Sequence, residues 1–484
     1  MNDATLWAVS LAIAHLVICL VAAVLISMNR RPTSAIAWVL AIIFVPYLGI
    51  LFFLLIGVGK LPRHRRAQQA EVNRLVTERT AGLSTVGNSG EWPTWLGSLV
   101  RLNRELGSLP MVGGNRVRLL PDYVGSIEAM VAAIDRAEYY VHVEFYILVH
   151  DQTTHPFFEA LRRACERGVT VRVLSDFVTG FQFPNRRETR RLLREMGAEW
   201  LPLLPLVPWR GQWQRPDMRN HRKIVVVDGY TGFMGSQNMI DSSYLKKKNV
   251  QRGLHWHELM VEAEGPIVRE LNAVFLTDWY SESGELLPID TTPVVFSPRP
   301  ELVDAQVVPS GPSFDNDNNL KLFVALIHQA ERRISITSPY FVPDESLLIA
   351  LITAAARGVA VELFVSEVAD QVLVYHAQRS YYESLLAAGV RIHLYRAPTV
   401  LHSKHFSIDD EVAVIGSSNM DIRSFALNME VSMLVHGRGF VTAMRAVEDD
   451  YRRASIPLDL AEWVNRPLRQ KVADNLARLT SELQ

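Results

Sequence analysis

The chain has 484 residues, is 49% hydrophobic, carries a formal net charge of −1 and contains two cysteines. This length accommodates a membrane anchor and two domains with separate cores. The near-neutral charge disfavours a protein that binds the phosphate backbone of nucleic acids. Two isolated cysteines exclude a disulfide framework and a Cys-x-x-Cys metal site.

Two apolar runs open the chain, Leu6 to Met28 and about Ala35 to Val58. Each is long enough for a membrane-spanning helix, which needs roughly 20 residues. A cleaved signal peptide is the alternative for the first run, but the preceding residues lack positive charge and the run is too long for a signal peptide's apolar core. Pro46 and Gly49 interrupt the second run, which leaves open a kinked or re-entrant helix.

Basic residues around these runs predict an orientation. Two crossings place the amino terminus and the rest of the chain on the same side. That side carries more basic residues than the loop between the runs: Lys60, Arg63, Arg65 and Arg66 against Arg30 and Arg31. Because basic residues favour the cytoplasmic side, we expect a multi-pass membrane protein whose remaining domains are cytoplasmic.

Beyond about residue 115 the pattern alternates between strands and helices, which is typical of a layered α/β fold. One order of elements occurs twice. Its first copy is a strand at Tyr140–Tyr146, a helix at Phe157–Glu166 and a strand at Thr170–Ser175; its second is a strand at Ile334–Tyr340, a helix at Leu347–Ala356 and a strand at Ala360–Ser366. The chain therefore reads as an internal duplication.

The duplication predicts the domain organisation. We expect two transmembrane helices in residues 1–60, a basic connecting segment in 61–114, a first domain in 115–295 and a second in 296–484. The tail from Leu458 to Leu483 reads as an amphipathic helix, broken near Pro467, that packs on the second domain.

A proline-broken apolar segment, Trp200 to Trp213, precedes the first motif described below and is not expected to form an ordinary helix or interior strand. Its tryptophans and arginine suit a membrane interface, so we interpret it as a lip that faces lipid. A loop between domains is the alternative. Phe177, Phe181 and Phe183 fit an extension of this lip. The run Lys246 to Lys248 suits the attraction of anionic headgroups, although a lysine run is at least as often a solvated loop.

Each half then contains the same motif. His221-x-Lys223-x-x-x-x-Asp228 is followed by Ser236-x-Asn238. In the second half His402-x-Lys404-x-x-x-x-Asp409 is followed by Ser417-x-Asn419. Both asparagines lie seventeen residues after their histidine, and the chain has only eight lysines. Two matches with the same downstream partners are a strong indication of one active site built from two half-sites.

Strand periodicity places the histidine and lysine of each motif on one side of a strand. A two-residue turn after each aspartate then sets His221 opposite Asn238 and Lys223 opposite Ser236, and likewise in the second half His402 opposite Asn419 and Lys404 opposite Ser417. Asp228 and Asp409 lie at the far strand ends, so we regard them as turn and network residues first and catalytic residues second. The serines fit either a substrate contact or a local hydrogen bond.

This set of residues suits phosphodiester chemistry without a metal or an organic cofactor. One histidine attacks phosphorus to form a phosphohistidine, and the other protonates the departing alcohol and later deprotonates the incoming one. The lysines and asparagines hold the phosphoryl oxygens. A carboxylate would fix the tautomer of each imidazole. From chain position we assign Glu430 to His402 and, with a longer interval, Glu258 to His221.

The paired motif resembles the phospholipase D superfamily. The apolar runs and the segments Met218–Met239 and Leu401–Phe425 resemble bacterial cardiolipin synthases in particular. The resemblance implies two tandem phospholipase D-like domains, with mixed sheets flanked by helices and a pseudo-twofold axis, in the bacterial inner membrane. It also implies transfer of a phosphatidyl group between two phosphatidylglycerol molecules with release of glycerol, His221 as the nucleophile and His402 as the acid and base. The stretch Tyr244 to His255 has no assignment from the motif.

Other activities share these motifs. A membrane-bound phospholipase D would let water take the phosphohistidine, and a phosphatidylserine synthase would use a nucleotide-activated donor. A nuclease of the superfamily is disfavoured by the apolar runs and the charge, and a non-catalytic scaffold by two intact motifs. The expected partners are the bilayer and an anionic phospholipid, not nucleic acid, and the sequence is compatible with an oligomer.

Overall fold

The computed structural model describes residues 3–28, 32–57, 61–80, 92–210, 212, 215–288, 299, 301–314 and 317–481. The chain forms two compact units. The N-terminal unit consists of residues 1–61 with the short segment 214–218, and the large unit contains the rest of the chain.

The N-terminal unit contains α1 (Asp3–Ser27), α2 (Pro32–Phe44) and α3 (Pro46–Ile56). Within the described residues, α1 is the one helix that is long and apolar enough to cross a membrane. The expected interruption of the second run is present, since α2 ends at Phe44 and Pro46 begins α3. Helix α3 packs closely on α2, because a Cβ atom at Gly49 would lie 2.7 Å from the Ala41 carbonyl oxygen.

Neither α2 nor α3 can cross a bilayer alone. At a rise of about 1.5 Å per residue they are about 20 Å and 17 Å long, whereas the hydrocarbon core is about 30 Å thick. The second predicted crossing is therefore not one continuous helix. Arg30, Arg31 and Lys60, which entered the orientation argument, lie outside the described residues.

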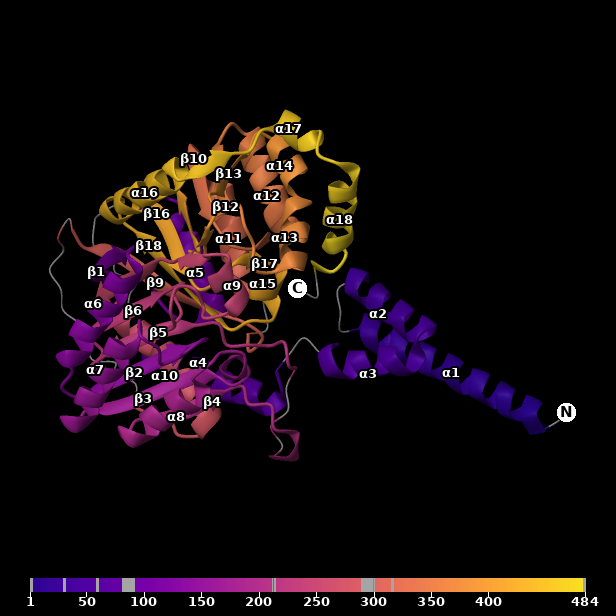
Figure 1. Ribbon diagram of the computed structural model, residues 1–484, viewed down its shortest axis with the longest axis horizontal. Coiled ribbons are helices and arrows are strands. Elements are labelled where there is room, and N and C mark those ends of the chain that lie inside the picture. Colours follow the sequence, from indigo (N-terminus) through magenta and orange to yellow (C-terminus); the bar gives the residue numbers. More distant parts are fainter. Residues whose placement is uncertain are drawn as a thin grey trace. The chain divides into compact units, whose positions relative to one another are not determined.

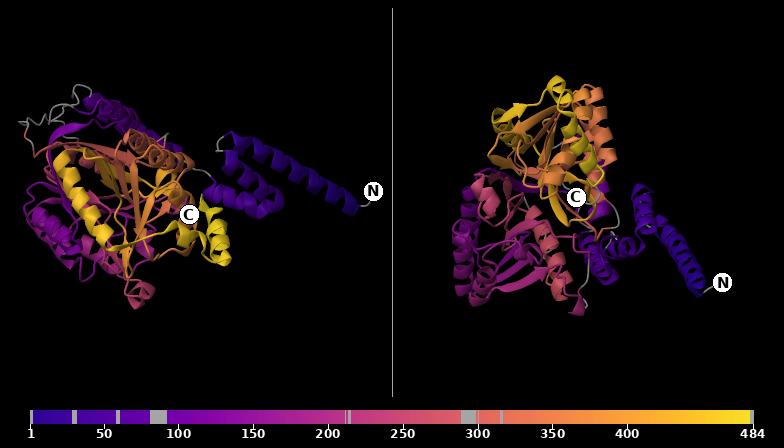
Figure 2. Two further views of the ribbon diagram at one scale, coloured as in Figure 1. Left: turned by 90° about the horizontal axis from the view of Figure 1, so that it is seen from above. Right: turned by 45° about the vertical axis from the view of Figure 1, so that its right-hand side comes forward.

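The large unit is built on one 15-stranded sheet, whose strand order is β19-β13-β12-β10-β15-β16-β18-β9-β1-β8-β6-β5-β2-β3-β4. Read from either end toward β9 and β1, the two halves have matching order, and only β19 is additional. Strands β1 (Val112–Leu120) and β9 (Val303–Ser310) pair antiparallel at the junction. Figure 1 shows the first half in purple and magenta and the second in orange and yellow, and Figure 2 shows the same halves from two other sides. The two copies of the duplicated unit thus share one continuous sheet.

The remaining strands of the first half are β2 (Tyr140–Phe145), β3 (Thr170–Asp176), β4 (Glu199–Leu203), β5 (Lys223–Val227), β6 (Thr231–Gly235), β7 (His255–His257) and β8 (Met260–Glu264). Those of the second half are β10 (Arg333–Thr337), β11 (Phe341–Val342), β12 (Ala360–Ser366), β13 (Arg391–Tyr395), β14 (Thr399–Leu401), β15 (His405–Ile408), β16 (Val412–Gly416), β17 (Met420–Asp421), β18 (Glu430–His436) and β19 (Ser455–Pro457). The repeated strands expected from the sequence are confirmed, with ends that differ by up to three residues.

The first-half helices are α4 (Arg63–Thr80), α5 (Leu96–Gly107), α6 (Tyr123–Asp135), α7 (His155–Glu166), α8 (Arg186–Glu195), α9 (Lys247–Gln251) and α10 (Ile267–Ser283). The second-half helices are α11 (Asn318–Gln329), α12 (Glu345–Ala356), α13 (Val372–Arg379), α14 (Tyr382–Ala387), α15 (Ile422–Ala426), α16 (Arg438–Arg453), α17 (Leu460–Val464) and α18 (Leu468–Arg478). Apolar side chains pack between helices and sheet on both faces. The expected break near Pro467 separates α17 from α18.

The hairpin register differs from the expected one by one residue. Val227 pairs with Thr231, and Ile408 pairs with Val412. Asp228 and Asp409 adopt left-handed φ values of 51° and 48°, so each turn uses three residues instead of two. In the second half the Gly416 amide accordingly donates to the Lys404 carbonyl over 3.1 Å, which places the lysine opposite glycine and not serine.

The expected lip segment begins as an edge strand. Strand β4 pairs only with β3 at the end of the sheet, and a short 3₁₀ turn follows at Pro208–Arg210. Trp209 in this turn is 83% exposed. Gly211 and Trp213 lie outside the described residues. Of the three phenylalanines considered with the segment, Phe181 is exposed and Phe183 is buried.

Candidate active site

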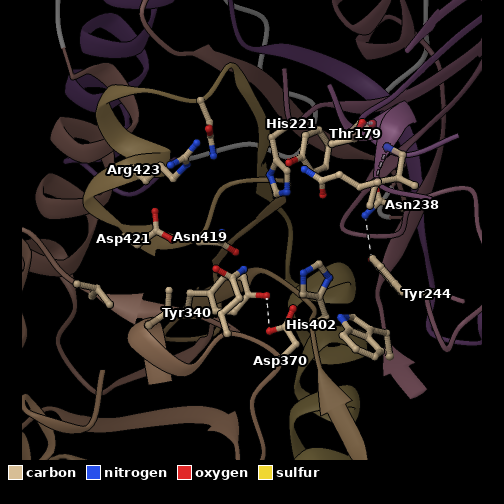
Figure 3. A pocket seen from close by; sticks show the side chains of 18 of the residues that line it. Thr179, His221, Asn238, Tyr244, Tyr340, Asp370, His402, Asn419, Asp421 and Arg423 are labelled. Carbon is tan, nitrogen blue, oxygen red and sulfur yellow. Dashed lines mark hydrogen bonds between the residues drawn. The ribbon is translucent and has the colours of Figure 1, made fainter. Parts of the chain in front are cut away.

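A cavity of about 370 Å³ brings the two motifs together. His221 and Asn238 line it from the first half, and His402 and Asn419 line it from the second. Figure 3 shows the two imidazole rings facing the same space, with Tyr340 and Asp370 beside His402. The expectation that two half-sites form one cavity agrees with this geometry.

His221 lies just before β5 and is held by the second half. Its amide donates to the Met429 carbonyl over 2.8 Å. Its Nδ1 lies 3.0 Å from Glu430 Oε2 and 3.1 Å from the Ser417 carbonyl oxygen. Because both neighbours are acceptors, the proton belongs on Nδ1 and the Nε2 lone pair stays available. Burial, with the nearby Lys223, lowers the pKa of His221 well below its ordinary value, so the ring is neutral.

His402 is held by the first half in the same manner. Its amide donates to the His257 carbonyl over 2.8 Å, and its Nδ1 lies 2.7 Å from Glu258 Oε1. Burial lowers the pKa of His402, and the Glu258 carboxylate opposes that shift. Of the two imidazoles, His402 is the one whose carboxylate partner favours its protonated form.

The pairing of histidines with carboxylates is therefore crossed between the halves, and the expected pairing within each half is wrong. Short parallel contacts explain the crossing. Strand β14 pairs with β7, which sets Leu401 beside His257, and an isolated bridge joins Asn220 to Met429. The residue before each histidine thus lies beside the residue before the other half's glutamate. This brings His402 next to Glu258 and His221 next to Glu430.

The two carboxylates differ in electrostatics. Burial raises the pKa of Glu258, but His402 and Lys404 lower it further, so the pKa lies below its ordinary value. Burial raises the pKa of Glu430 to about 7, with Lys223 opposing the shift. At neutral pH the carboxylate beside His402 is ionised and the one beside His221 is partly protonated. The two halves thus place the same residue type beside each histidine, but the two carboxylates differ in protonation state.

The two lysines lie beneath the histidines and are not among the residues that line the cavity. The ammonium group of Lys223 donates to the His221 carbonyl. That of Lys404 lies 2.6 Å from the His402 carbonyl and 3.2 Å from its Nε2. Burial lowers the pKa of Lys223 to about 7 and that of Lys404 to about 8. An anionic phosphodiester in the cavity would therefore favour the charged form of both lysines.

The serines support the carboxylates. The Ser417 hydroxyl donates to Glu430 and accepts from the Val431 amide. The Ser236 hydroxyl bonds to the Leu259 backbone and lowers the pKa of Glu258. These contacts agree with the local-bond alternative for both serines.

The two asparagines line the cavity but differ in their partners. The carboxamide of Asn238 donates to the Tyr244 hydroxyl over 2.8 Å and accepts from the Ile147 amide over 3.2 Å. The carboxamide oxygen of Asn419 is buried and has no hydrogen-bond partner within the described part of the chain. The two asparagines are therefore equivalent in the motif but not in their contacts.

The structure does not bring Asp228 and Asp409 to the cavity, so the catalytic role considered second for both aspartates needs correction. The carboxylate of Asp228 accepts from the amides of Glu138, Tyr139 and Tyr140 at the opposite end of the strand. Asp409 accepts from the amides of residues 331–333 in the second half. Each carboxylate thus fixes the start of the neighbouring strand, as the turn-and-network interpretation expects.

Asp228→Ala is expected to lower the free energy of unfolding by about 1–3 kcal/mol, because it leaves three strand-initiating amides without their charged acceptor. Urea unfolding of the full chain in detergent, followed by circular dichroism, measures the change. Asp135→Ala is the control, since it removes only an exposed ion pair with Arg163 and should cost less than about 1 kcal/mol. Lost turnover at unchanged stability would restore a catalytic role for Asp228.

Several cavity residues were not identified from the sequence. The Tyr244 hydroxyl donates to Glu258 Oε1 over 3.0 Å and so connects Asn238 to the carboxylate that contacts His402. It begins the stretch that the motif left unassigned. Tyr340 donates to Asp370 over 2.9 Å at the cavity wall. Others that line the cavity are Tyr146, Trp256, Asp421, Arg423 and Asn428. Only their position in the fold distinguishes them from other polar or aromatic residues.

A family model described as "Cardiolipin synthase, PLD-like domain" matches residues 130–279 and 323–451, more than half of the chain. The chain belongs to the cardiolipin synthase family. The matched segments contain one His-Lys motif each, so the resemblance seen in the sequence is confirmed. A second model, described as "Phospholipase_D-nuclease N-terminal", matches residues 16–57.

Curated relatives in the cardiolipin synthase family cover nearly the whole chain. A cardiolipin synthase of Geobacillus kaustophilus is 34% identical over 94% of this chain and 90% of its own length. Cardiolipin synthase A of Serratia proteamaculans is 32% identical over 95% of this chain and 94% of its own. The crystal structure of phosphatidylserine synthase from Haemophilus influenzae has a TM-score of 0.57 at 15% identity, covering 79% of this chain and 99% of that one. This last likeness supports the fold alone.

Proposed function

We propose that this protein is a cardiolipin synthase that transfers a phosphatidyl group from one phosphatidylglycerol to another. The observation that carries the proposal is one cavity lined by both motif histidines, in which the Nδ1 of each histidine contacts a carboxylate from the other half. The chain is also similar along its length to cardiolipin synthases. The activity is that of a phosphatidyltransferase.

The first step follows from the charge states. His221 Nε2 attacks phosphorus, because its ring is neutral and its Nδ1 proton faces Glu430. The bond from phosphorus to the glycerol oxygen breaks, and protonated His402 gives its proton to that oxygen. Glycerol leaves, and a phosphatidyl group remains on His221. Lys223 and Lys404 offset the phosphoryl charge from beneath, while Asn419 offers its carboxamide to the substrate.

The second step reverses the roles. A hydroxyl of the second phosphatidylglycerol gives its proton to His402 and attacks phosphorus, and the bond from phosphorus to His221 breaks. The products are cardiolipin and the free enzyme. Tyr244 and Ser236 hold Glu258, and Ser417 holds Glu430, so both carboxylates act by orienting the histidines.

We further propose that the protein lies in a bacterial inner membrane with its large unit in the cytoplasm. The support is α1, which is long enough to span, and the arginines Arg63, Arg65 and Arg66 that follow the second apolar run. A multi-pass topology requires α2 and α3 to make the second crossing together. We retain 61–114, 115–295 and 296–484 as the proposed divisions of the remaining chain, although the boundary at 295 lies outside the described residues.

Purified protein incubated in vesicles with phosphatidylglycerol as the only lipid should produce cardiolipin and an equal amount of glycerol. Lipid analysis by mass spectrometry and an enzymatic glycerol assay measure both products. Phosphatidic acid in place of cardiolipin would show that water is the acceptor and would refute the synthase.

A further inference from the structure

The outer face of α18 is an apolar stripe that no described part of the large unit covers. Leu468, Val472, Leu476 and Leu479 are 75%, 48%, 60% and 80% exposed. Their spacing of three or four residues places them on one side of the helix. In a soluble domain such a stripe normally faces the core, so its outward direction needs an explanation.

The opposite face of α18 is fixed to the rest of the large unit by a buried carboxylate. The buried carboxylate of Asp474 lies 2.8 Å from His376 Nδ1 and 3.3 Å from Arg379 Nε, both on α13. It also lies 3.4 Å from Arg466. This network fixes the rotation of α18, and with it the direction of the apolar stripe.

The stripe borders the active-site cavity. Ser481, just beyond α18, lines the cavity, as do Gln371 and Val374 at the start of α13. Between the last two, Val372 and Leu373 are 65% and 58% exposed. We call these two residues and the α18 stripe the α13–α18 ridge. On the first-half side of the cavity, Phe181 is likewise exposed, next to the cavity residue Gln182.

The charged side chains on the exposed surface of α18 are basic. Helix α18 carries Arg469, Lys471 and Arg478, and its one acidic residue is the buried Asp474. An apolar stripe flanked by arginine and lysine is the composition of helices that lie in the interface of a membrane, where the charge attracts anionic lipids. A soluble protein partner would not require this combination.

We propose that the α13–α18 ridge inserts into the interface of an anionic phospholipid bilayer and holds the cavity mouth against the lipid headgroups. The proposal rests on the proposed function, because it concerns a lipid substrate. A cavity of about 370 Å³ is of the size that holds a small ligand, which suits a headgroup but not two acyl chains. The chains therefore stay in the bilayer, and the mouth must touch it.

The double variant Leu476→Ser/Leu479→Ser in the full chain tests the ridge. On phosphatidylglycerol vesicles we expect cardiolipin formation to fall about tenfold, because two leucines no longer enter the interface. On dihexanoyl-phosphatidylglycerol below its micelle concentration we expect an unchanged rate, because a soluble lipid needs no docking. The matched control is Tyr139→Ser/Tyr230→Ser, which removes two exposed aromatic side chains at the strand ends away from the cavity and should alter neither rate.

A depth measurement tests the same contact independently of activity. A fluorophore on Leu476→Cys, with Cys19 and Cys165 replaced by serine, should be quenched by brominated lipid in phosphatidylglycerol vesicles, whereas one on Tyr139→Cys should not. An unquenched label at position 476 overturns the proposal, and cross-linking between two chains through this position would identify a second copy as the occupant. A quenched label in a protein that forms no cardiolipin refutes the proposed function and leaves the docking surface intact.

Discussion

His221→Ala is expected to abolish covalent labelling by a phosphatidyl donor and to reduce cardiolipin formation by at least about 10³-fold. The substitution removes the ring whose Nδ1 is held by Glu430 and Ser417 and whose neutral state suits attack on phosphorus. Phosphatidylglycerol with a radioactive phosphate, followed by mild denaturation and electrophoresis, measures the phosphohistidine. Because phosphohistidine is labile in acid, label that disappears on acid treatment identifies the adduct.

His402→Ala is the informative companion. It removes the acid, so glycerol should leave slowly, but a donor with a good leaving group such as p-nitrophenol needs no proton. With that donor we expect His402→Ala to accumulate label, since the step that activates the acceptor is also lost. Label that forms in His221→Ala and is absent in His402→Ala would reverse the two roles.

Glu258→Gln is expected to impair the acid, although Glu258 lies in the same half as the nucleophile. The substitution keeps the shape of the side chain but removes the charge that opposes the fall in the pKa of His402. The protonated form of His402 then becomes rarer. We expect turnover of phosphatidylglycerol to fall about 100-fold, while adduct formation from the p-nitrophenyl donor stays close to that of the unmodified protein.

Glu430→Gln provides the contrast, because its carboxylate faces His221. It should slow adduct formation from both donors. If the carboxylates acted within their own halves, the two glutamine variants would exchange these phenotypes. Single-turnover measurements with each donor therefore distinguish pairing of each histidine with the other half's carboxylate from pairing within one half.

The fold was largely predictable because its signals are local and repeated. Periodicity located the strands at Tyr140, Thr170, Ile334 and Ala360 and the helices between them, since these elements bury one face and follow each other at short range. The joining of the halves through β1 and β9 was not predictable. That pairing connects Val112 with Ala305 and Asn115 with Val303, which are far apart in the chain, and no turn or spacing indicates it.

The site was predictable in its residues and less so in its connections. The motif identifies both histidines and both lysines, because the same spacing occurs in each half with the same downstream serine and asparagine. The pairing of Glu258 and Glu430 was assigned wrongly, because chain distance is a poor guide once short parallel bridges join the halves. The register was wrong by one residue because a left-handed aspartate at Asp228 leaves no pattern that separates a three-residue turn from a two-residue one.

The crossed carboxylates limit what either half can become by itself. A half without its partner has a histidine with no carboxylate and a carboxylate with no histidine, so it would need a second copy of itself to be complete. In such a symmetric pair both histidines would have identical surroundings and therefore the same pKa, whether they act as nucleophile or as acid. A fused chain is free of that constraint. The ionised Glu258 and the partly protonated Glu430 illustrate the consequence: one half can supply the nucleophile while the other supplies the acid and base.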